Sequence, residues 1–217
     1  MTTCELSALR RLFVAQEPFI DSELDAIAML DLIYSLSVED ILDIIKSNQD
    51  DLRPIAAANI PQFSNPNVIF KVLKVVIDSE SDDLNFERIG YYLRPRGTKP
   101  GALRKYGENH YKFAMDLGLV TEKRPFSATD LGLAFYLMED TDKRLAIQKK
   151  LILRVPIIQQ ALLTAETDMI DMAALMRQYL KESTVKRRSS NVRRLLLYIM
   201  DNAGVDLQHT LNNIIWR

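Results

Sequence analysis

A pattern of two helices, a polar turn and a terminating glycine occurs twice in this chain, and this repeat constrains the fold more than any other feature. In the first copy, a helix expected to end at Leu93 is followed by a turn and a long helix that stops at Gly118. In the second copy, a helix expected over residues 169–180 ends at Leu180 and the second helix stops at Gly204, at offsets of 87 and 86 residues. The apolar residue after each glycine, Leu119 or Val205, can begin a strand. Glycine favours the left-handed conformation that ends a helix. The spacing therefore predicts a duplicated helical unit.

The sequence before the first copy is helical and strongly acidic. Apolar residues recur at spacings of two to four over residues 21–34 and 38–45, and Ser37 is the expected N-cap of the second of these helices. Residues 1–85 carry 6 basic and 15 acidic side chains, a net charge of −9. Because this charge repels polyanions, we predict that the region contacts a protein partner or forms a homodimer.

Prolines and acidic residues separate this part from the first copy. Asn65 is the expected cap of a helix that has Pro66 at its first position and residues 68–77 as its body. The acidic stretch 78–83 follows that helix and gives the best boundary in the chain. The predicted regions are an acidic helical region over residues 1–80, a first module over residues 81–155 and a second module over residues 156–217.

The residues after Gly118 predict a β-hairpin. Residues 119–122 and 126–128 can form two strands around a short turn, and Thr129 is the expected cap of the next helix. Two helices followed by a hairpin are the elements of a winged helix. The second copy has only the tail 207–217 for its own hairpin, so we expect it to keep a single strand or to borrow one from a partner. We therefore expect a mainly α fold with small β wings, in which the acidic helical region precedes two winged-helix, or helix-turn-helix, modules.

Two passages resemble a known family. Residues 119–132, which end in Thr129-Asp130-Leu131-Gly132, resemble the strand, wing, strand and Thr-x-x-Gly passage of prokaryotic winged-helix proteins. Residues 183–192, with Ser183-Thr184, Arg187-Arg188, Ser190 and Val192, are similar to the second module of tandem winged-helix DNA-binding regions in restriction and anti-phage defence proteins. The resemblance covers residues 85–205. It implies a DNA-binding protein of restriction-modification, anti-phage defence, mobile-element control or transcription regulation.

The stretch 182–194 is rich in basic residues and points to phosphate. Five Lys and Arg side chains stand against one acid, Glu182, with Ser, Thr and Asn between them. Cations release counterions from DNA, while hydroxyl and amide groups donate to phosphates or base edges. Residues 86–217 as a whole carry a net charge of +8. We predict that the long helix of each module enters the major groove of double-stranded DNA.

The predicted nucleic-acid-binding residues are of two kinds. Those expected to contact phosphates are Arg94, Arg96, Lys99, Lys123, Lys186 and Arg187, with Arg124 beside Lys123 at the wing tip. Those expected to read base edges are Arg104, Lys105, Asn109, Arg188, Ser189, Asn191 and Arg193, and Lys112 shares the exposed helix face of the first three. The opposite, buried stripe is expected to contain Leu103, His110, Phe113, Ala114 and Leu117.

Three aromatic residues near these sites are interpreted as structural. Tyr91 and Tyr92 adjoin Ile89 and Leu93, so core packing is favoured over base stacking. Trp216 is expected to dock on the second module.

Other classes of protein fit poorly. Because the chain has one cysteine, Cys4, and two histidines, His110 and His209, we expect neither a disulfide framework nor a metal site, and no cofactor. No acidic residue stands two positions before any lysine, as a metal nuclease requires, and His110 with Lys112 lacks the rest of a phosphodiesterase motif. Phosphate-binding glycine loops, membrane spans and signal peptides are also missing. We expect a cytoplasmic protein that is not an enzyme.

Two alternatives stay open. Tandem winged helices also serve as protein scaffolds in chromosome-condensing complexes, and the overall net charge of −1 suits that role. Exposed apolar stripes over residues 21–45 would favour it. The second alternative is a subunit whose catalytic partner is a separate chain.

Overall fold

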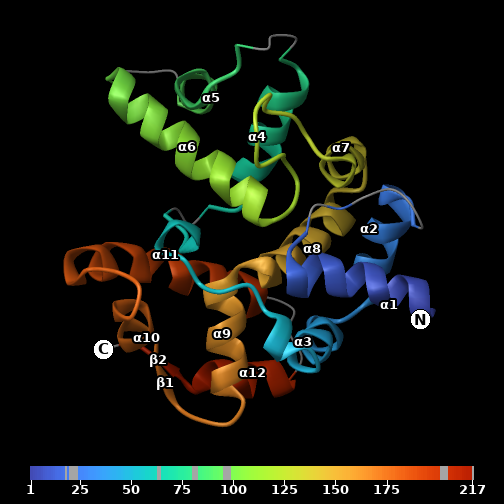
Figure 1. Ribbon diagram of the computed structural model, residues 1–217, viewed down its shortest axis with the longest axis vertical. Coiled ribbons are helices and arrows are strands. Elements are labelled where there is room, and N and C mark those ends of the chain that lie inside the picture. The colour runs from blue at the N-terminus through green and yellow to red at the C-terminus, as the bar shows by residue number, and fades with distance from the viewer. Residues whose placement is uncertain are drawn as a thin grey trace.

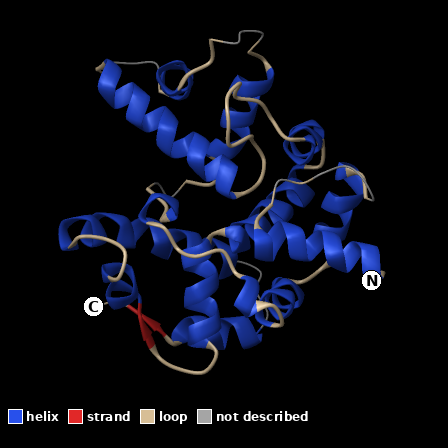
Figure 2. Cartoon of the chain, in the orientation of Figure 1, coloured by secondary structure: helices blue, strands red, loops and turns tan. Residues whose placement is uncertain are grey.

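A computed structural model describes residues 1–17, 19, 24–62, 65–79, 83–94, 99–200 and 205–216. This part of the chain is mainly helical, as the sequence predicts, with one small sheet (Figure 2). None of its helices is long and apolar enough to cross a membrane. The larger helices are α1 (Thr3–Arg10), α2 (Ala26–Ser35), α3 (Val38–Lys46), α4 (Val68–Ile77), α5 (Phe86–Leu93), α6 (Pro100–Asp116), α7 (Asp130–Leu137), α8 (Thr141–Leu151), α9 (Pro156–Ala165), α10 (Met172–Arg177), α11 (Glu182–Met200) and α12 (Val205–Asn212).

Short helical turns and two strands complete the described elements. A π-helical turn, η1 (Arg11–Ala15), follows α1, and the 3₁₀ turns are η2 (Gln49–Asp51), η3 (Ala57–Asn59) and η4 (Ile152–Arg154). The strands are β1 (Ile170–Asp171) and β2 (Ile214–Ile215). Figure 1 shows α4, α5 and α6 at one end of the molecule and α9 to α12 with the sheet at the other, while α1 to α3 lie at one side.

Contacts cross both of the predicted region boundaries. Helix α4 belongs to residues 1–80 but packs on α5 and α6, and α2 packs on α7 and α8. Lys143 of α8 also donates to the carboxylate of Asp31 in α2 at 2.6 Å. The boundaries themselves stay predictions, but the acidic helices share a core with the rest of the chain.

The predicted helix caps are confirmed at two positions and shifted at one. Ser37 caps α3, where its hydroxyl accepts from the Asp40 backbone N–H at 2.9 Å. Thr129 caps α7 and accepts from the Gly132 N–H at 3.0 Å. The predicted cap Asn65 instead accepts from the Asn67 N–H at 3.2 Å, so a turn precedes α4 and the helix begins at Val68 rather than at the proline.

The Thr-x-x-Gly passage has a physical basis in this fold. Gly118 has a φ of 78°, the left-handed conformation predicted for it. Thr129 donates its hydroxyl to the Gly118 carbonyl at 2.8 Å, which ties the end of α6 to the start of α7. A Cβ on Gly132 would stand 1.9 Å from the Leu119 carbonyl oxygen. Threonine and glycine therefore allow α7 to lie directly on the chain that leaves α6.

The second copy departs from the prediction at both ends. Its first helix was expected over residues 169–180, but β1 occupies its beginning and α10 is shorter. Val205 was expected to start a strand, yet it starts α12, and the chain then returns as β2, parallel to β1. A parallel pair needs a long crossover, which α10, α11 and α12 supply. The tail therefore keeps a single strand, β2, which follows the helix α12. Gly204 lies outside the described residues.

Candidate nucleic-acid interface

The predicted recognition helix α6 packs against α5 through two glycines. A Cβ on Gly90 would lie 1.9 Å from the Leu103 carbonyl oxygen, and a Cβ on Gly107 would lie 1.9 Å from the Phe86 carbonyl oxygen. The two helix backbones are therefore in direct contact, with no side chain between them. All of the predicted buried stripe of α6 is buried, namely Leu103, His110, Phe113, Ala114 and Leu117.

His110 is a packed histidine, as predicted. Its ring Nδ1 lies 2.7 Å from the Tyr106 carbonyl oxygen, and only 3% of the residue is exposed. Burial lowers the pKa of His110, which favours the neutral ring. Among the described residues, no three His, Cys, Asp or Glu side chains come together as a metal site.

The exposed face of α6 carries its predicted cations, but two of them are already paired. Glu108 accepts from Lys112 at 2.7 Å and from Lys105 at 3.1 Å, and these bonds hold the pKa of Glu108 below its usual range. Exposed pairs of this kind contribute little to stability and can exchange for phosphate. Arg104 is exposed on the same helix. Asn109 is half-buried, and its Oδ1 is buried beside Gln62, so the predicted base-reading role does not suit it.

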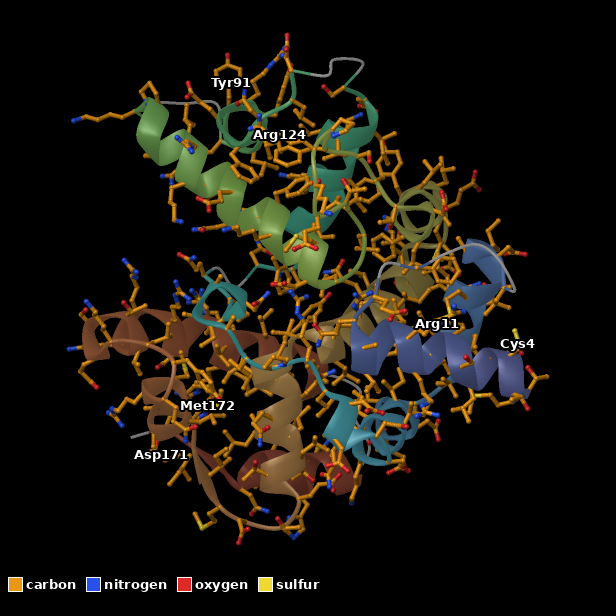
Figure 3. The ribbon with its side chains drawn as sticks, viewed as in Figure 1. Cys4, Arg11, Tyr91, Arg124, Asp171 and Met172 are labelled. Atoms are coloured by element: carbon orange, nitrogen blue, oxygen red, sulfur yellow. The ribbon has the colours of Figure 1, made fainter. Side chains whose placement is uncertain are left out.

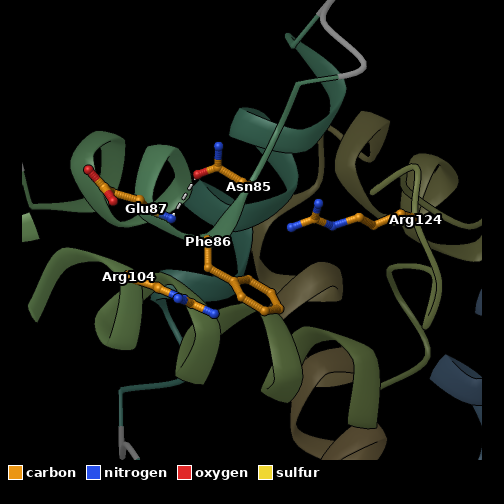
Figure 4. Close-up of a pocket in the computed structure, with 5 residues that line it drawn as sticks. All are labelled: Asn85, Phe86, Glu87, Arg104 and Arg124. Carbon is orange, nitrogen blue, oxygen red and sulfur yellow. Dashed lines mark hydrogen bonds between the residues drawn. The ribbon is translucent and has the colours of Figure 1, made fainter. Parts of the chain in front are cut away.

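Arg104 and Arg124 both line a cavity of about 380 Å³, and Arg124 belongs to the hairpin that follows α6 (Figure 4). The wing, residues 119–128, is a hairpin with one antiparallel bridge, Val120 to Ala128. Arg124 extends from it toward Phe86, which Arg104 approaches from α6. The cavity opens at the start of α5, where the helix dipole favours anions. Two arginines that the sequence assigned separately thus line one cavity, together with the acid Glu87.

Aromatic side chains fix the wing beside this cavity. Phe126 stacks on Phe86 with ring centroids 4.9 Å apart, and Tyr111 lies 4.3 Å from Phe126. The guanidinium of Arg124 lies over the Phe126 ring at 5.3 Å. Such contacts orient an arginine without neutralising its charge. Lys123 and Arg124 are both exposed at the wing tip, as predicted.

The turn between α5 and α6 presents further exposed groups. Arg94 and Lys99 are exposed, and Arg94 lies 5.8 Å from the ring centroid of Tyr106. Arg96 lies outside the described residues. The core packing predicted for Tyr91 and Tyr92 is wrong, since 54% and 58% of these residues are exposed. Figure 3 shows Tyr91 on the outer side of α5. Helix neighbours point about 100° apart, so adjacency to the buried Ile89 did not bury them.

Helix α11 divides its predicted site residues between solvent and core. Lys186, Arg187 and Arg193 are exposed, and Asn191 is half-buried. The guanidinium of Arg193 lies 6.0 Å from the ring centroid of Trp216. The tryptophan follows β2 and helps to line a cavity with residues of α10 and α11, which confirms its predicted docking on the second module.

Two base-reading assignments on α11 are wrong. Arg188 is 9% exposed, and its Nη1 donates to the carbonyls of Ala57 at 2.6 Å and Ile60 at 3.1 Å. Ser189 donates to the Val185 carbonyl at 2.7 Å and faces Met176 of α10. Both side chains are occupied within the protein and cannot read a base edge in this arrangement.

No sequence pattern predicted the segment whose carbonyls accept hydrogen bonds from Arg188. This bridging segment, residues 57–62, passes between α11 and α6. Asn59 donates its amide to Asp116 of α6 at 3.1 Å, while Arg188 of α11 holds the carbonyls nearby. The two predicted recognition helices are therefore neighbours that share one spacer from the N-terminal third of the chain.

Arg188→Ala should lower the free energy of unfolding by about 2 kcal/mol, because it removes charge-assisted bonds and leaves the Ile60 carbonyl buried without its donor. The neighbouring exposed variant Arg187→Ala should stay within about 0.5 kcal/mol of the parent. Urea unfolding of the three proteins measures the difference. Equal stability of the two variants would show that the bridging segment does not depend on Arg188.

Comparison with protein-family models, with curated proteins and with solved structures finds no match to this chain.

Proposed function

We propose that this protein is a non-enzymatic double-stranded DNA-binding protein of prokaryotic restriction, anti-phage defence, mobile-element control or transcription regulation. The observation that carries the proposal is the cavity at the start of α5, where Arg104 of α6 and Arg124 of the wing converge. An arginine on a long exposed helix and another on an adjoining hairpin suit a duplex, whose groove admits a helix while its backbone meets the flanking chain.

The exposed cations of the two modules extend this surface. They are Arg94, Lys99, Arg104, Lys105, Lys123, Arg124, Lys186, Arg187 and Arg193. Because α6 and α11 lie on either side of the bridging segment, cations of both helices can serve one ligand. Arg188, Ser189 and Asn109 are left out of the interface for the reasons given above.

DNA affinity should fall steeply with salt. If about six phosphates are neutralised, log K against log salt should have a slope near −5, and Arg104→Ala with Arg124→Ala should bring that slope about two closer to zero. Fluorescence anisotropy of a labelled duplex over a salt series gives the slope. Arg10→Ala, an exposed cation of α1, is the matched control and should leave the slope unchanged. The proposal is wrong if Arg10→Ala changes the salt slope as much as the loss of Arg104 and Arg124 does, or if no duplex binds at low salt.

A second candidate, a protein scaffold, is favoured by an apolar groove between α2 and α7. The groove has a volume of about 540 Å³, and its most exposed apolar residues are Ile27, Leu137 and Leu133, with 68%, 64% and 42% of their surface exposed. Asp25, Asp31 and Asp130 line the same groove. An acidic rim around apolar side chains suits a basic amphipathic segment of a partner. If no duplex binds, this candidate takes first place.

A further inference from the structure

The most unusual polar group in the molecule is the side chain of Arg154, in η4. Only 2% of this residue is exposed, and its Nε and Nη1 donors are buried without a hydrogen-bond partner. Among the described residues it forms no ion pair within 4 Å. Burial lowers the pKa of Arg154 to about 10, so the group keeps its charge at neutral pH. A buried charge with unused donors is costly unless something accepts from it.

One buried carboxyl group, that of Asp116, compensates this charge only in part. Asp116, at the end of α6, is 8% exposed and accepts from the Asn59 amide at 3.1 Å. Burial raises the pKa of Asp116 to about 7, while the positive charges of Arg53 and Arg154 oppose that rise. Near neutral pH this carboxyl is therefore about half protonated. In that form it can donate a hydrogen bond to an anion rather than repel one.

Both residues line a cavity of about 390 Å³ at the base of the wing. The walls come from Gln16 after η1, Arg53 before the bridging segment, the end of α6, the wing residues 120–123 and Arg154. The α6 end contributes Met115, Asp116 and Gly118, and Thr129 before α7 also lines the cavity. Arg53 and Lys123 are exposed and bring two further positive charges, against the single exposed acid Glu122. The lining thus has an excess of positive charge.

The guanidinium of Arg154 packs against Gly118, the residue just before the wing. A Cβ on Gly118 would lie 1.9 Å from Arg154 Nη1, so the guanidinium packs directly on the glycine backbone. Gly118 is also tied to Thr129 at the start of α7. A ligand in this cavity would contact the wing, η1 and η4 together, and would fix the wing relative to α9, which follows η4.

We propose that this cavity binds a small molecule through a phosphate group, with Arg154, Arg53 and Lys123 as the phosphate ligands. Guanidinium groups match the geometry of oxyanions, and lysine adds a point charge. The volume is that of a small-ligand pocket, at the lower end of the usual range. Because Arg154 is almost fully buried, a free small molecule reaches it where the backbone of a rigid duplex does not. The proposal is independent of the DNA-binding function.

Inorganic phosphate is the probe. At about pH 6.5 and constant ionic strength, about 20 mM phosphate in place of chloride should raise the Tm of the full chain by about 2 to 4 °C. Arg53→Gln, an exposed variant that leaves the core intact, should lose at least half of this shift. Lys71→Gln removes an exposed charge on α4, outside the cavity, and should keep the full shift.

Several results of this experiment would contradict phosphate binding in the cavity. No shift with phosphate in the parent protein overturns it, and so does an equal shift in Arg53→Gln and Lys71→Gln. Arg154→Gln should abolish the shift, but if that variant fails to fold, the Arg53 comparison still decides. A duplex that competes with phosphate, together with weaker duplex binding by Arg53→Gln, would assign the site to DNA phosphate and overturn the small-molecule proposal. Failure of DNA binding leaves the phosphate measurement unaffected.

Discussion

Gly107→Ala should lower the free energy of unfolding by about 3 kcal/mol. The added Cβ would stand 1.9 Å from the Phe86 carbonyl oxygen and 2.6 Å from the Gly90 backbone nitrogen. Both atoms belong to the backbone of α5, so no flexible side chain can move aside and the helices must separate. The better helix propensity of alanine, worth about 1 kcal/mol, opposes only part of this loss.

Gly101, in the first turn of the same helix, provides the matched control. A Cβ at this position meets nothing within 4 Å, so Gly101→Ala should leave stability unchanged or raise it slightly. Urea unfolding at 25 °C compares the two variants with the parent. If Gly107→Ala and Gly101→Ala have equal stability, α5 and α6 are not in the backbone contact described above.

The second large effect is a pH dependence carried by Asp116. Its pKa is about 7 in the folded protein, against the ordinary value of 3.8, so the folded state binds the proton more tightly. This contribution to stability is fully present below pH 4 and is lost as the pH rises through 7. Three pKa units correspond to about 4 kcal/mol as an upper bound. Asp116→Asn does not titrate, so its stability relative to the parent should rise by up to that amount between pH 4 and pH 8.

The measurement is urea unfolding of parent and variant across this pH range, in buffers without phosphate. Asp142→Asn, an exposed position in the first turn of α8, should show a nearly constant difference from the parent. A constant difference for Asp116→Asn as well would mean that the carboxyl is ionised throughout as the partner of Arg154. If the stability of Asp116→Asn relative to the parent instead falls between pH 4 and pH 8, the carboxyl of Asp116 is likewise ionised in the folded protein.

Several features of this protein follow from its sequence alone, because they depend on residues within one or two turns. Ser37 and Thr129 cap their helices through bonds to residues three positions ahead, and Gly118 ends α6 in the left-handed conformation. The buried stripe of α6 follows from helical periodicity. The wing tip with Lys123 and Arg124 follows from two short apolar runs around a turn.

The tertiary structure decided what those residues meet. In the sequence, Arg188 is one of five neighbouring cations. In the fold it is buried and donates to the carbonyls of Ala57 and Ile60, which lie 131 and 128 positions earlier in the chain. The single strand of the tail, β2, pairs with β1, and the local sequence pattern does not reveal this partner. Arg154 and Asp116 are ordinary in the sequence and become a charged cavity only where the ends of α6 and η4 meet. Periodicity fixes which face of a helix is apolar, whereas burial of a charge depends on which distant segment packs against it.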